Sequence, residues 1–230
     1  MRIEDLQAQV DAHWAERDLP SWPSPRPAMD PPRDEEYSRV SDPARYRIVH
    51  ERARAWTELL SELPGVRSES MPSAPLDANG RLGSFDRGTR LTSDREGTLP
   101  LLLLERDAAI TDHAGSDGGP TLAVLHLAVA EPTVELAFHP DCGCDACDWG
   151  SADLLEAIDE AVRHVVAGPL VILEGPRWQA QWHPDGGSSG GAGRGPDHDR
   201  VMELCRRLTE GEDVRLPRRT RAFVGSSWLP

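Results

Sequence analysis

The sequence predicts an α+β fold with a mostly antiparallel sheet of about five or six strands and three or four packed helices. Two observations favour this class. Some segments repeat apolar residues every three or four positions, as helices do. The apolar segments between them are short, bounded by turns and arranged as a meander. At 230 residues, the chain is long enough to bury a core as one domain or a small pair of domains.

Four ranges have one apolar side at helical spacing, and we expect helices over residues 3–16, 41–63, 152–167 and 200–210. The second has the clearest pattern. Its apolar residues recur at spacings of 3, 4, 3, 4 and 3 and form one continuous stripe: Tyr46, Val49, Ala53, Trp56, Leu60 and Leu63. Pro64-Gly65 ends this helix and Gly168-Pro169 ends the third, because neither pair can continue a helix.

The predicted strands are short and rich in apolar or β-branched residues, and they cover residues 89–93, 98–105, 122–129, 134–138, 170–173 and 178–182. The first two and the last two are expected to pair as hairpins. Residues 122–129 are apolar on both faces and are expected to form a central strand. Residues 66–87 are polar and rich in turn-forming residues, with one loop expected around Asp77-Ala78-Asn79-Gly80.

These elements suggest four parts of the chain. Residues 1–33 form an N-terminal helix and a proline-rich connector, because the six prolines between positions 20 and 33 block helix and sheet pairing. Residues 34–184 form the α+β core domain. Residues 185–197 are a Gly/Ser-rich flexible linker, and residues 198–230 are a C-terminal helix and tail that pack on the core.

The formal net charge is −14, which argues against nucleic acids and anionic membranes as partners, because both are polyanions. A basic protein partner is compatible with this charge. The N-terminus lacks the features of a signal peptide, and no apolar run approaches the roughly 20 residues that a membrane helix needs. We therefore expect a cytoplasmic protein, and the sequence indicates no oligomeric state.

The most distinctive segment is "HPDCGCDACDWG", residues 139–150, which places His139, Cys142, Cys144 and Cys147 within nine positions. In a reducing cytoplasm, clustered cysteines indicate metal binding or redox chemistry before a structural disulfide. Zinc prefers four tetrahedral ligands drawn from thiolates and imidazoles. The sequence therefore predicts one structural zinc ion held by these four residues, joining strand 134–138 to helix 152–167.

The Cys-x-Cys pair complicates this prediction, because neighbouring side chains in extended backbone point apart. Both thiols reach one ion only if Gly143 bends the chain. A remote fourth ligand is an alternative to His139, and Cys205 or His183 are the candidates for it.

Other readings of the sequence remain open. Cys144 and Cys147 form a C-x-x-C pair, the motif of thiol–disulfide redox proteins, although Asp145 and Asp148 would disfavour thiolates. The cysteines could also be inert packed thiols. The acidic charge suits a protein-binding module, such as an immunity or adaptor protein. No arrangement of residues predicts a reaction, and we expect no catalytic residues.

Three stretches resemble an uncharacterised family of high-GC bacteria, a domain of unknown function. They are "EEYSRVSDPARY" at residues 35–46, "PDCGCDACD" at residues 140–148 and the closing Ser227-Trp228 pair. The resemblance spans most of the chain, and the cysteine motif is its most specific part. It implies no activity, so no catalytic role is carried over to these residues.

Overall fold

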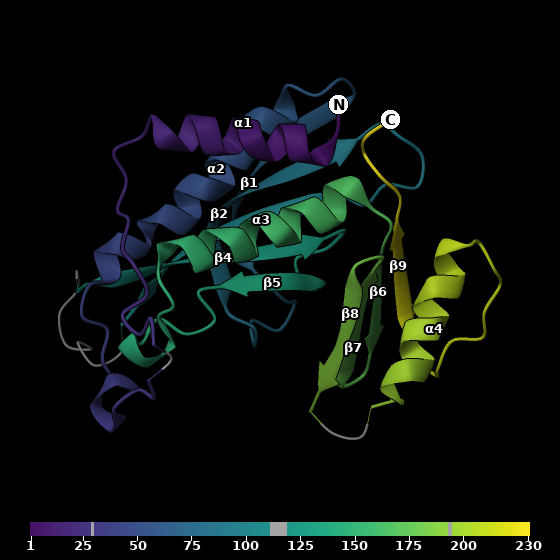
Figure 1. The fold of residues 1–230 in the computed structure, drawn as a ribbon. Coiled ribbons are helices and arrows are strands. Elements are labelled where there is room, and N and C mark those ends of the chain that lie inside the picture. The colour runs from purple at the N-terminus through teal and green to yellow at the C-terminus, as the bar shows by residue number, and fades with distance from the viewer. Residues whose placement is uncertain (29, 111–118, 193–194) are drawn as a thin grey trace.

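The computed structural model describes residues 1–28, 30–110, 119–192 and 195–230. Within these ranges the chain forms four α-helices and nine strands, which divide into two antiparallel sheets (Figure 1). The predicted α+β class is confirmed. The strands are shared between a five-stranded and a four-stranded sheet.

The five-stranded sheet is a meander in the order β1-β2-β3-β4-β5. Its strands are β1 (Val66–Pro75), β2 (Ser84–Ser93), β3 (Leu101–Ala109), β4 (Thr121–Val129) and β5 (Glu135–His139). The predicted hairpin between residues 89–93 and 98–105 is the β2–β3 pair, in which Leu91 lies opposite Leu101. The strand expected at the centre, β4, lies next to the edge strand β5.

The loop expected around residues 77–80 lies between β1 and β2, but the rest of the turn-rich stretch 66–87 is largely sheet. β1 and the first half of β2 lie in this range and pair along their length, from Val66 opposite Ser93 to Pro75 opposite Ser84. Most β1 side chains are exposed, so the strand shows no alternation of apolar and polar residues. Backbone pairing with β2, rather than burial, holds this edge strand in place.

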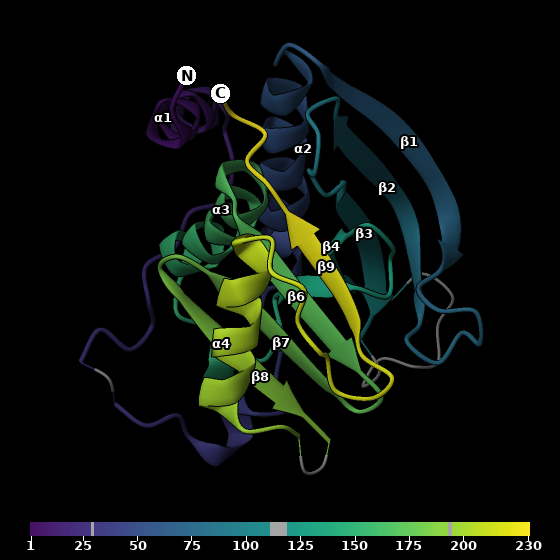
Figure 2. The same ribbon diagram turned by 90° about the vertical axis from the view of Figure 1, so that its right-hand side faces the viewer.

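Helices cover one face of the five-stranded sheet. α2 (Ile48–Ser61) and α3 (Ser151–Ala167) pack on the sheet, and α1 (Ile3–Ala15) packs against both helices on their outer side (Figures 1 and 2). A short 3₁₀-helix, η2 (Pro43–Arg47), leads into α2. The predicted stripe of α2 points into the core, where Trp56 and Leu60 are fully buried.

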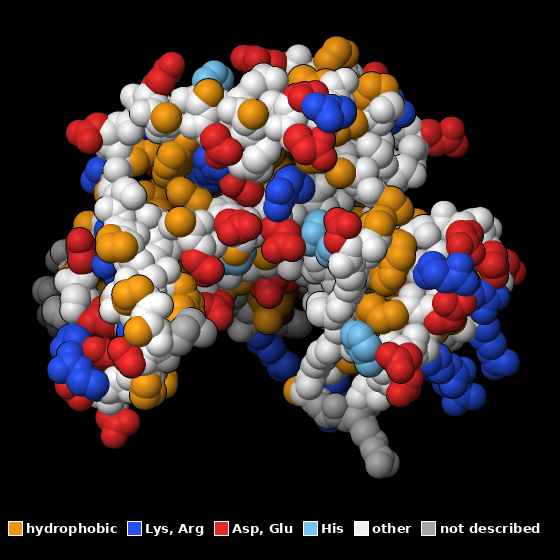
Figure 3. Space-filling model, in the orientation of Figure 1, with side chains coloured by type: hydrophobic (Ala, Val, Ile, Leu, Met, Phe, Trp, Pro, Cys, Tyr) orange, Lys and Arg blue, Asp and Glu red, His pale blue; other side chains and the backbone are white. Residues whose placement is uncertain are grey.

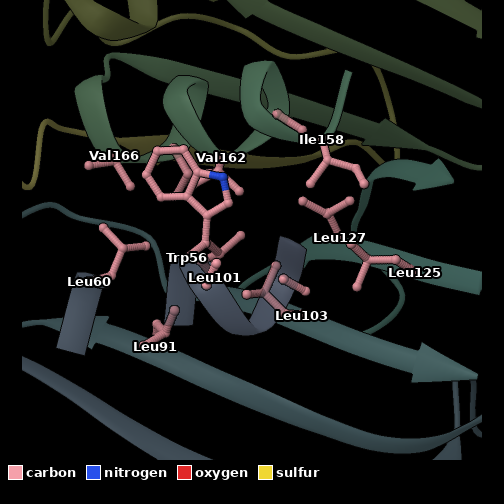
Figure 4. Close-up of a cluster of buried hydrophobic side chains, with 14 of the residues drawn as sticks. Trp56, Leu60, Leu91, Leu101, Leu103, Leu125, Leu127, Ile158, Val162 and Val166 are labelled. Atoms are coloured by element: carbon pink, nitrogen blue, oxygen red, sulfur yellow. The ribbon is translucent and has the colours of Figure 1, made fainter. Parts of the chain in front are cut away.

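The core lies between α2, α3 and the sheet. Figure 4 shows the Trp56 ring between the two helices near Val162, with Leu101 and Leu103 of β3 below it. The indole Nε1–H donates a hydrogen bond of 2.7 Å to Asp159 of α3. The ring therefore fills the space between the helices while its polar atom has a partner.

The second sheet has the order β8-β7-β6-β9 and carries the last helix. Its strands are β6 (Leu170–Gly175), β7 (Trp178–His183), β8 (Gly186–Gly191) and β9 (Arg221–Gly225), and α4 (His198–Thr209) packs against it. Val201 and Cys205 of α4 are fully buried against Val171 and Leu173 of β6.

The Gly/Ser-rich segment at 185–197, expected to be a flexible linker, contains strand β8. Its backbone pairs with β7 from Gly191 opposite Trp178 to Gly186 opposite His183. All six residues of β8 are exposed, so the segment has no apolar pattern that would indicate a strand. The second sheet also combines β6 and β7 of the expected core domain with β9 of the expected C-terminal tail.

The C-terminal tail, which follows β9, forms two hydrogen bonds that connect the second sheet to α3 and to the segment before β3. The backbone N–H of Trp228 donates to the carbonyl of Val166 at the end of α3, at 2.9 Å. The Trp228 indole N–H donates to the carbonyl of Leu99, at 3.2 Å. The tail thus contacts α3 and the segment that leads into β3.

Among the charged side chains on the face formed by α1 and α3, Asp and Glu are more prominent than Arg in Figure 3. This distribution agrees with the net charge of −14. Within the described ranges, no helix has the length and apolarity to cross a bilayer.

Candidate metal centre

Three of the four cysteines lie in the turn between β5 and α3, residues 139–150, which we call the cysteine turn. The sulfurs of Cys142, Cys144 and Cys147 all lie within 4.8 Å of one another, and all three are free thiols. The structure thus brings together three of the four predicted ligands in a group compact enough for one metal ion.

The distances between these sulfurs are too long for a disulfide bond and close to those of sulfurs that share a metal ion. The Cys142 and Cys144 sulfurs are 3.1 Å apart. A disulfide bond measures about 2.05 Å, and two sulfurs on one tetrahedral zinc ion lie about 3.8 Å apart when each Zn–S bond is about 2.3 Å. A shift of less than about 1 Å would therefore give this pair the spacing of zinc ligands.

The glycine between these two cysteines allows the turn to approach β4. A Cβ atom at Gly143 would lie 2.3 Å from a methyl carbon of Leu122. Cys142 and Cys144 do converge, as the single-ion prediction requires. The Gly143 backbone is not in the left-handed region. Close packing against β4 therefore explains the glycine.

The three thiols differ in pKa. Burial acts to raise the pKa of Cys144, but hydrogen bonds from the Cys142 thiol and the Cys147 backbone N–H outweigh it and hold the pKa below its ordinary value. Burial and the interaction with Cys144 raise the pKa of Cys147 to about 12. Burial also raises the pKa of Cys142. The turn thus favours one thiolate, and a metal ion that binds all three sulfurs must displace protons.

Asp145 anchors the turn to a segment about a hundred residues earlier in the chain. Its carboxylate accepts hydrogen bonds from Arg39 Nε at 2.6 Å, from the Ser41 hydroxyl at 2.7 Å and from the Ser41 backbone N–H at 2.9 Å. Burial acts to raise the pKa of Asp145, but these bonds hold the pKa below its usual range. The side chain expected to disfavour thiolates is therefore paired with Arg39.

Arg26 of the proline-rich connector inserts its guanidinium into the cysteine turn. It donates to the carbonyl oxygens of Asp145 at 3.2 Å and Asp148 at 3.0 Å, and also to that of Ala146. Arg26 is only 8% exposed. Three carbonyls of the turn therefore converge on one buried cation, and Glu36 supplies an opposite charge at 3.5 Å.

Asp148 also anchors the cysteine turn, through a second set of hydrogen bonds. Its carboxylate accepts from the Trp22 indole N–H at 2.9 Å, from Arg45 Nη2 at 2.7 Å and from the Gly150 N–H at 2.9 Å. The Arg45 guanidinium also lies 4.5 Å from the centre of the Trp22 ring. The connector and the segment before α2 thus hold the turn through side chains from both directions.

His139, the fourth predicted ligand, ends β5 but does not join the three sulfurs. Among the residues that the structure describes, no other His, Cys, Asp or Glu has a ligand atom within 4.8 Å of all three. The His139 Nε2 atom is buried and has no hydrogen-bond partner in the same ranges. Burial also lowers the pKa of His139. A role for His139 as the fourth ligand stays a prediction.

The two remote candidates lie elsewhere. Cys205 is fully buried in the apolar cluster between α4 and the second sheet, and burial raises its pKa to about 12. His183 at the end of β7 stacks on His164 of α3, with ring centres 3.4 Å apart. Neither belongs to the group of three sulfurs.

A pocket of about 330 Å³ opens beside the sulfurs, and we call it the cysteine pocket. Cys142, Cys147 and His139 line one part of it. Cys144, which is 6% exposed, is not among its lining residues. The cysteine pocket therefore gives solvent and small molecules access to two of the three sulfurs.

The model of a family of unknown function, DUF6226, matches residues 10–230. The chain belongs to the DUF6226 family. The resemblance expected from the sequence is thereby confirmed at the level of an uncharacterised family. No curated protein and no solved structure matches the chain.

Two of the stretches that carried the resemblance contact each other in this DUF6226 chain. Residues 35–46 provide Arg39, Ser41 and Arg45, which hold Asp145 and Asp148 of the cysteine turn. Nothing in the spacing of these residues predicts the contacts. The available signal was the placement of arginines in one stretch and of aspartates beside the cysteines in the other.

Proposed function

We propose that the protein binds one zinc ion through Cys142, Cys144 and Cys147, and that the ion has a structural role at the junction of β5 and α3. The observation that carries the proposal is the convergence of three free sulfurs within 4.8 Å in one short turn. Three thiolates this close together repel one another, and a divalent cation among them would remove that repulsion.

Ligand chemistry favours zinc over other metals. Thiolates are soft ligands that select zinc, Cu(I) or iron–sulfur clusters, whereas Mg²⁺ and Ca²⁺ require oxygen ligands. A single compact group of three thiols suits a tetrahedral ion with short bonds of about 2.3 Å. Zinc also needs no redox partner, and its site tolerates a fourth ligand of several kinds.

The position of the turn supports a structural role. Its short 3₁₀-helix, η4 (Asp145–Cys147), is closed by a backbone hydrogen bond from Cys147 N–H to the Cys144 carbonyl. Most other contacts of the turn are with side chains of residues 22–45, such as Arg26 and Arg39. A bound ion would link the turn internally and so fix the carbonyls and carboxylates that hold the N-terminal segment.

A thiol–disulfide redox function is the second candidate, because the Cys142 and Cys144 sulfurs are only 3.1 Å apart. A reactive pair needs a thiolate, and the lowered pKa of Cys144 favours one. Thiol alkylation rates measured against pH test this candidate. A metal-free protein in which no thiolate forms below about pH 8 would exclude it.

The structural role is tested by thermal unfolding of the reduced, metal-free protein with and without an excess of free Zn²⁺. Zinc at a hundred times its dissociation constant is expected to add about 2.7 kcal/mol to the free energy of unfolding. Cys144→Ser should abolish the effect, and Cys205→Ser should keep it, because Cys205 lies in a different cluster. An identical response of wild type and Cys144→Ser would contradict the proposal.

A further inference from the structure

The cysteine pocket is the strongest feature that a purely structural zinc site leaves unexplained. A structural site is closed by four protein ligands, whereas a site that binds external ligands keeps a position open. Here three sulfurs converge, and within the described ranges no fourth His, Cys, Asp or Glu joins them. Two of the three sulfur-bearing residues, Cys142 and Cys147, line a pocket of about 330 Å³.

The three sulfurs differ in their access to the pocket. Cys144 is buried, while Cys142 and Cys147 line the cavity and reach the surface. An ion held by all three would have its remaining tetrahedral position directed away from them. The cavity that borders two of the three is the available space for a fourth ligand.

The residues that line the pocket indicate which chemical groups such a ligand would have. Phe138, Trp149 and Leu154 provide apolar surface. Trp149 is 45% exposed, which is unusual for so large an aromatic side chain. Arg26 lies 5.7 Å from the centre of its ring. The exposed ring provides an aromatic wall for a small organic ligand.

The pocket also carries negative charge. Asp141 and Asp153 line it, and neither takes part in a salt bridge with any residue of the described ranges. Asp148, the third carboxylate of the lining, is already paired with Arg45 at 2.7 Å. Two carboxylates without a cation and an aromatic face favour a ligand that carries a positive charge.

We propose that the fourth coordination position opens onto the cysteine pocket and takes the sulfur of a small aminothiol, whose ammonium group lies near Asp141 and Asp153. This inference rests on the proposed zinc site. A soft thiolate is the donor that a thiolate-bound zinc ion accepts readily. The ligand would bind as its thiolate, and its proton would pass to solvent.

His139 provides the competing arrangement. Its Nε2 atom is buried without a partner in the described ranges, and the residue lines the same pocket. If the imidazole moves onto the ion, the position is occupied by protein and no external sulfur binds. The experiment must therefore separate His139 from an added thiol as the fourth ligand.

Cobalt(II) is the probe, because its visible absorption reports both tetrahedral geometry and the number of sulfur ligands. The reduced protein is loaded with one equivalent of Co²⁺ and titrated with 2-aminoethanethiol. The sulfur-to-cobalt absorption is expected to rise and saturate. 2-Mercaptoethanol, which has the same sulfur without the amine, is expected to bind at least about tenfold more weakly, the scale of one lost charge interaction near a protein surface.

Matched variants identify the contacts. Asp153→Asn is expected to reduce 2-aminoethanethiol affinity about tenfold and leave 2-mercaptoethanol affinity unchanged. Glu156→Gln, an exposed neighbour on α3 outside the pocket lining, should change neither affinity. His139→Ala should retain the response to the thiol.

Three outcomes would overturn the inference. A cobalt spectrum that no thiol alters but that His139→Ala changes would make His139 the fourth ligand, and the proposed zinc site would stand. Loss of cobalt from the protein on addition of the thiol would mean that the thiol competes for the ion. Failure of the protein to bind cobalt at all would refute the inference together with the proposed function.

Discussion

Replacement of Arg26 tests whether the N-terminal connector holds the cysteine turn. Arg26→Met keeps an unbranched apolar stem but removes the charged guanidinium and all its hydrogen-bond donors. The guanidinium now donates to three carbonyls of the turn, those of Asp145, Ala146 and Asp148, and is 8% exposed. The substitution therefore leaves three acceptors without their donor in a nearly dry site.

The magnitude follows from these contacts. A hydrogen bond to a charged group contributes about 1.5–3 kcal/mol, but bonds that share one donor are not additive and water can reach part of the vacated space. We expect Arg26→Met to lower the free energy of unfolding of the metal-free protein by about 2–4 kcal/mol. Zinc affinity should fall about 10–100-fold, as it does when groups that orient metal ligands are removed.

The assays are urea unfolding followed by tryptophan fluorescence, with a chelator present, and zinc affinity from competition with a chromogenic chelator. Arg33→Met is the matched control, because Arg33 lies in the same connector but is 66% exposed and pairs with Glu35 and Glu36. It should change stability by no more than about 0.5 kcal/mol. Equal stability losses for Arg26→Met and Arg33→Met would refute the reasoning.

Three further predictions concern the rest of the molecule. Asp159→Asn should lower the free energy of unfolding in urea by about 2–4 kcal/mol. Asp159 pairs with Arg52, which is 2% exposed, and the change leaves this buried cation with only Asp11, which is largely exposed, as its carboxylate partner. A loss below about 1 kcal/mol would mean that the pair is solvated. Burial and the adjacent His183 lower the pKa of His164 to about 4 from an ordinary 6.5. The unfolded chain thus binds the additional proton first, so the contribution of His164 to stability should be constant above about pH 6.5 and fall towards pH 4 by at most about 1.4 kcal/mol per pH unit. His164→Gln should flatten this dependence, and an unchanged slope would contradict the pKa. Cys205→Ser should cost about 1–3 kcal/mol, since it places a hydroxyl in an apolar cluster, but should leave zinc stoichiometry unchanged.

The helices could be predicted from the sequence because each buries one side against a single core. In α2 the stripe through Val49, Trp56 and Leu60 repeats with the helical period, and these residues are fully buried in the structure. The same logic located α1, α3 and α4 within one or two residues at most ends. For a helix that buries one side in a single core, the spacing of its apolar residues is sufficient to predict its position.

Strands β1 and β8 could not be found in this way. β1 exposes most of its side chains, and β8 consists of glycine and serine. Their extended conformation depends on backbone hydrogen bonds to β2 and β7. Every residue type offers a carbonyl acceptor, and all except proline offer an N–H donor, so these bonds leave no trace in the pattern of apolar residues. The division of the strands into two sheets was missed for the same reason.

Only the part of the candidate site whose residues lie close together in the sequence could be predicted. Cys142, Cys144 and Cys147 lie within six positions of one another, so a turn brings their sulfurs together. Arg26 reaches the same turn from about 120 residues away in the chain. No spacing in the sequence predicts a contact between such distant residues, and only the folded structure shows it.

X-ray absorption at the zinc edge tests the central claim most directly. Protein purified under reducing conditions, then exchanged into thiol-free buffer, should show three sulfur neighbours at about 2.3 Å from each zinc. Cys144→Ser should lose the signal, while Cys205→Ser should reproduce the wild-type spectrum. A wild-type protein without zinc, or with zinc surrounded only by nitrogen and oxygen, would contradict the account.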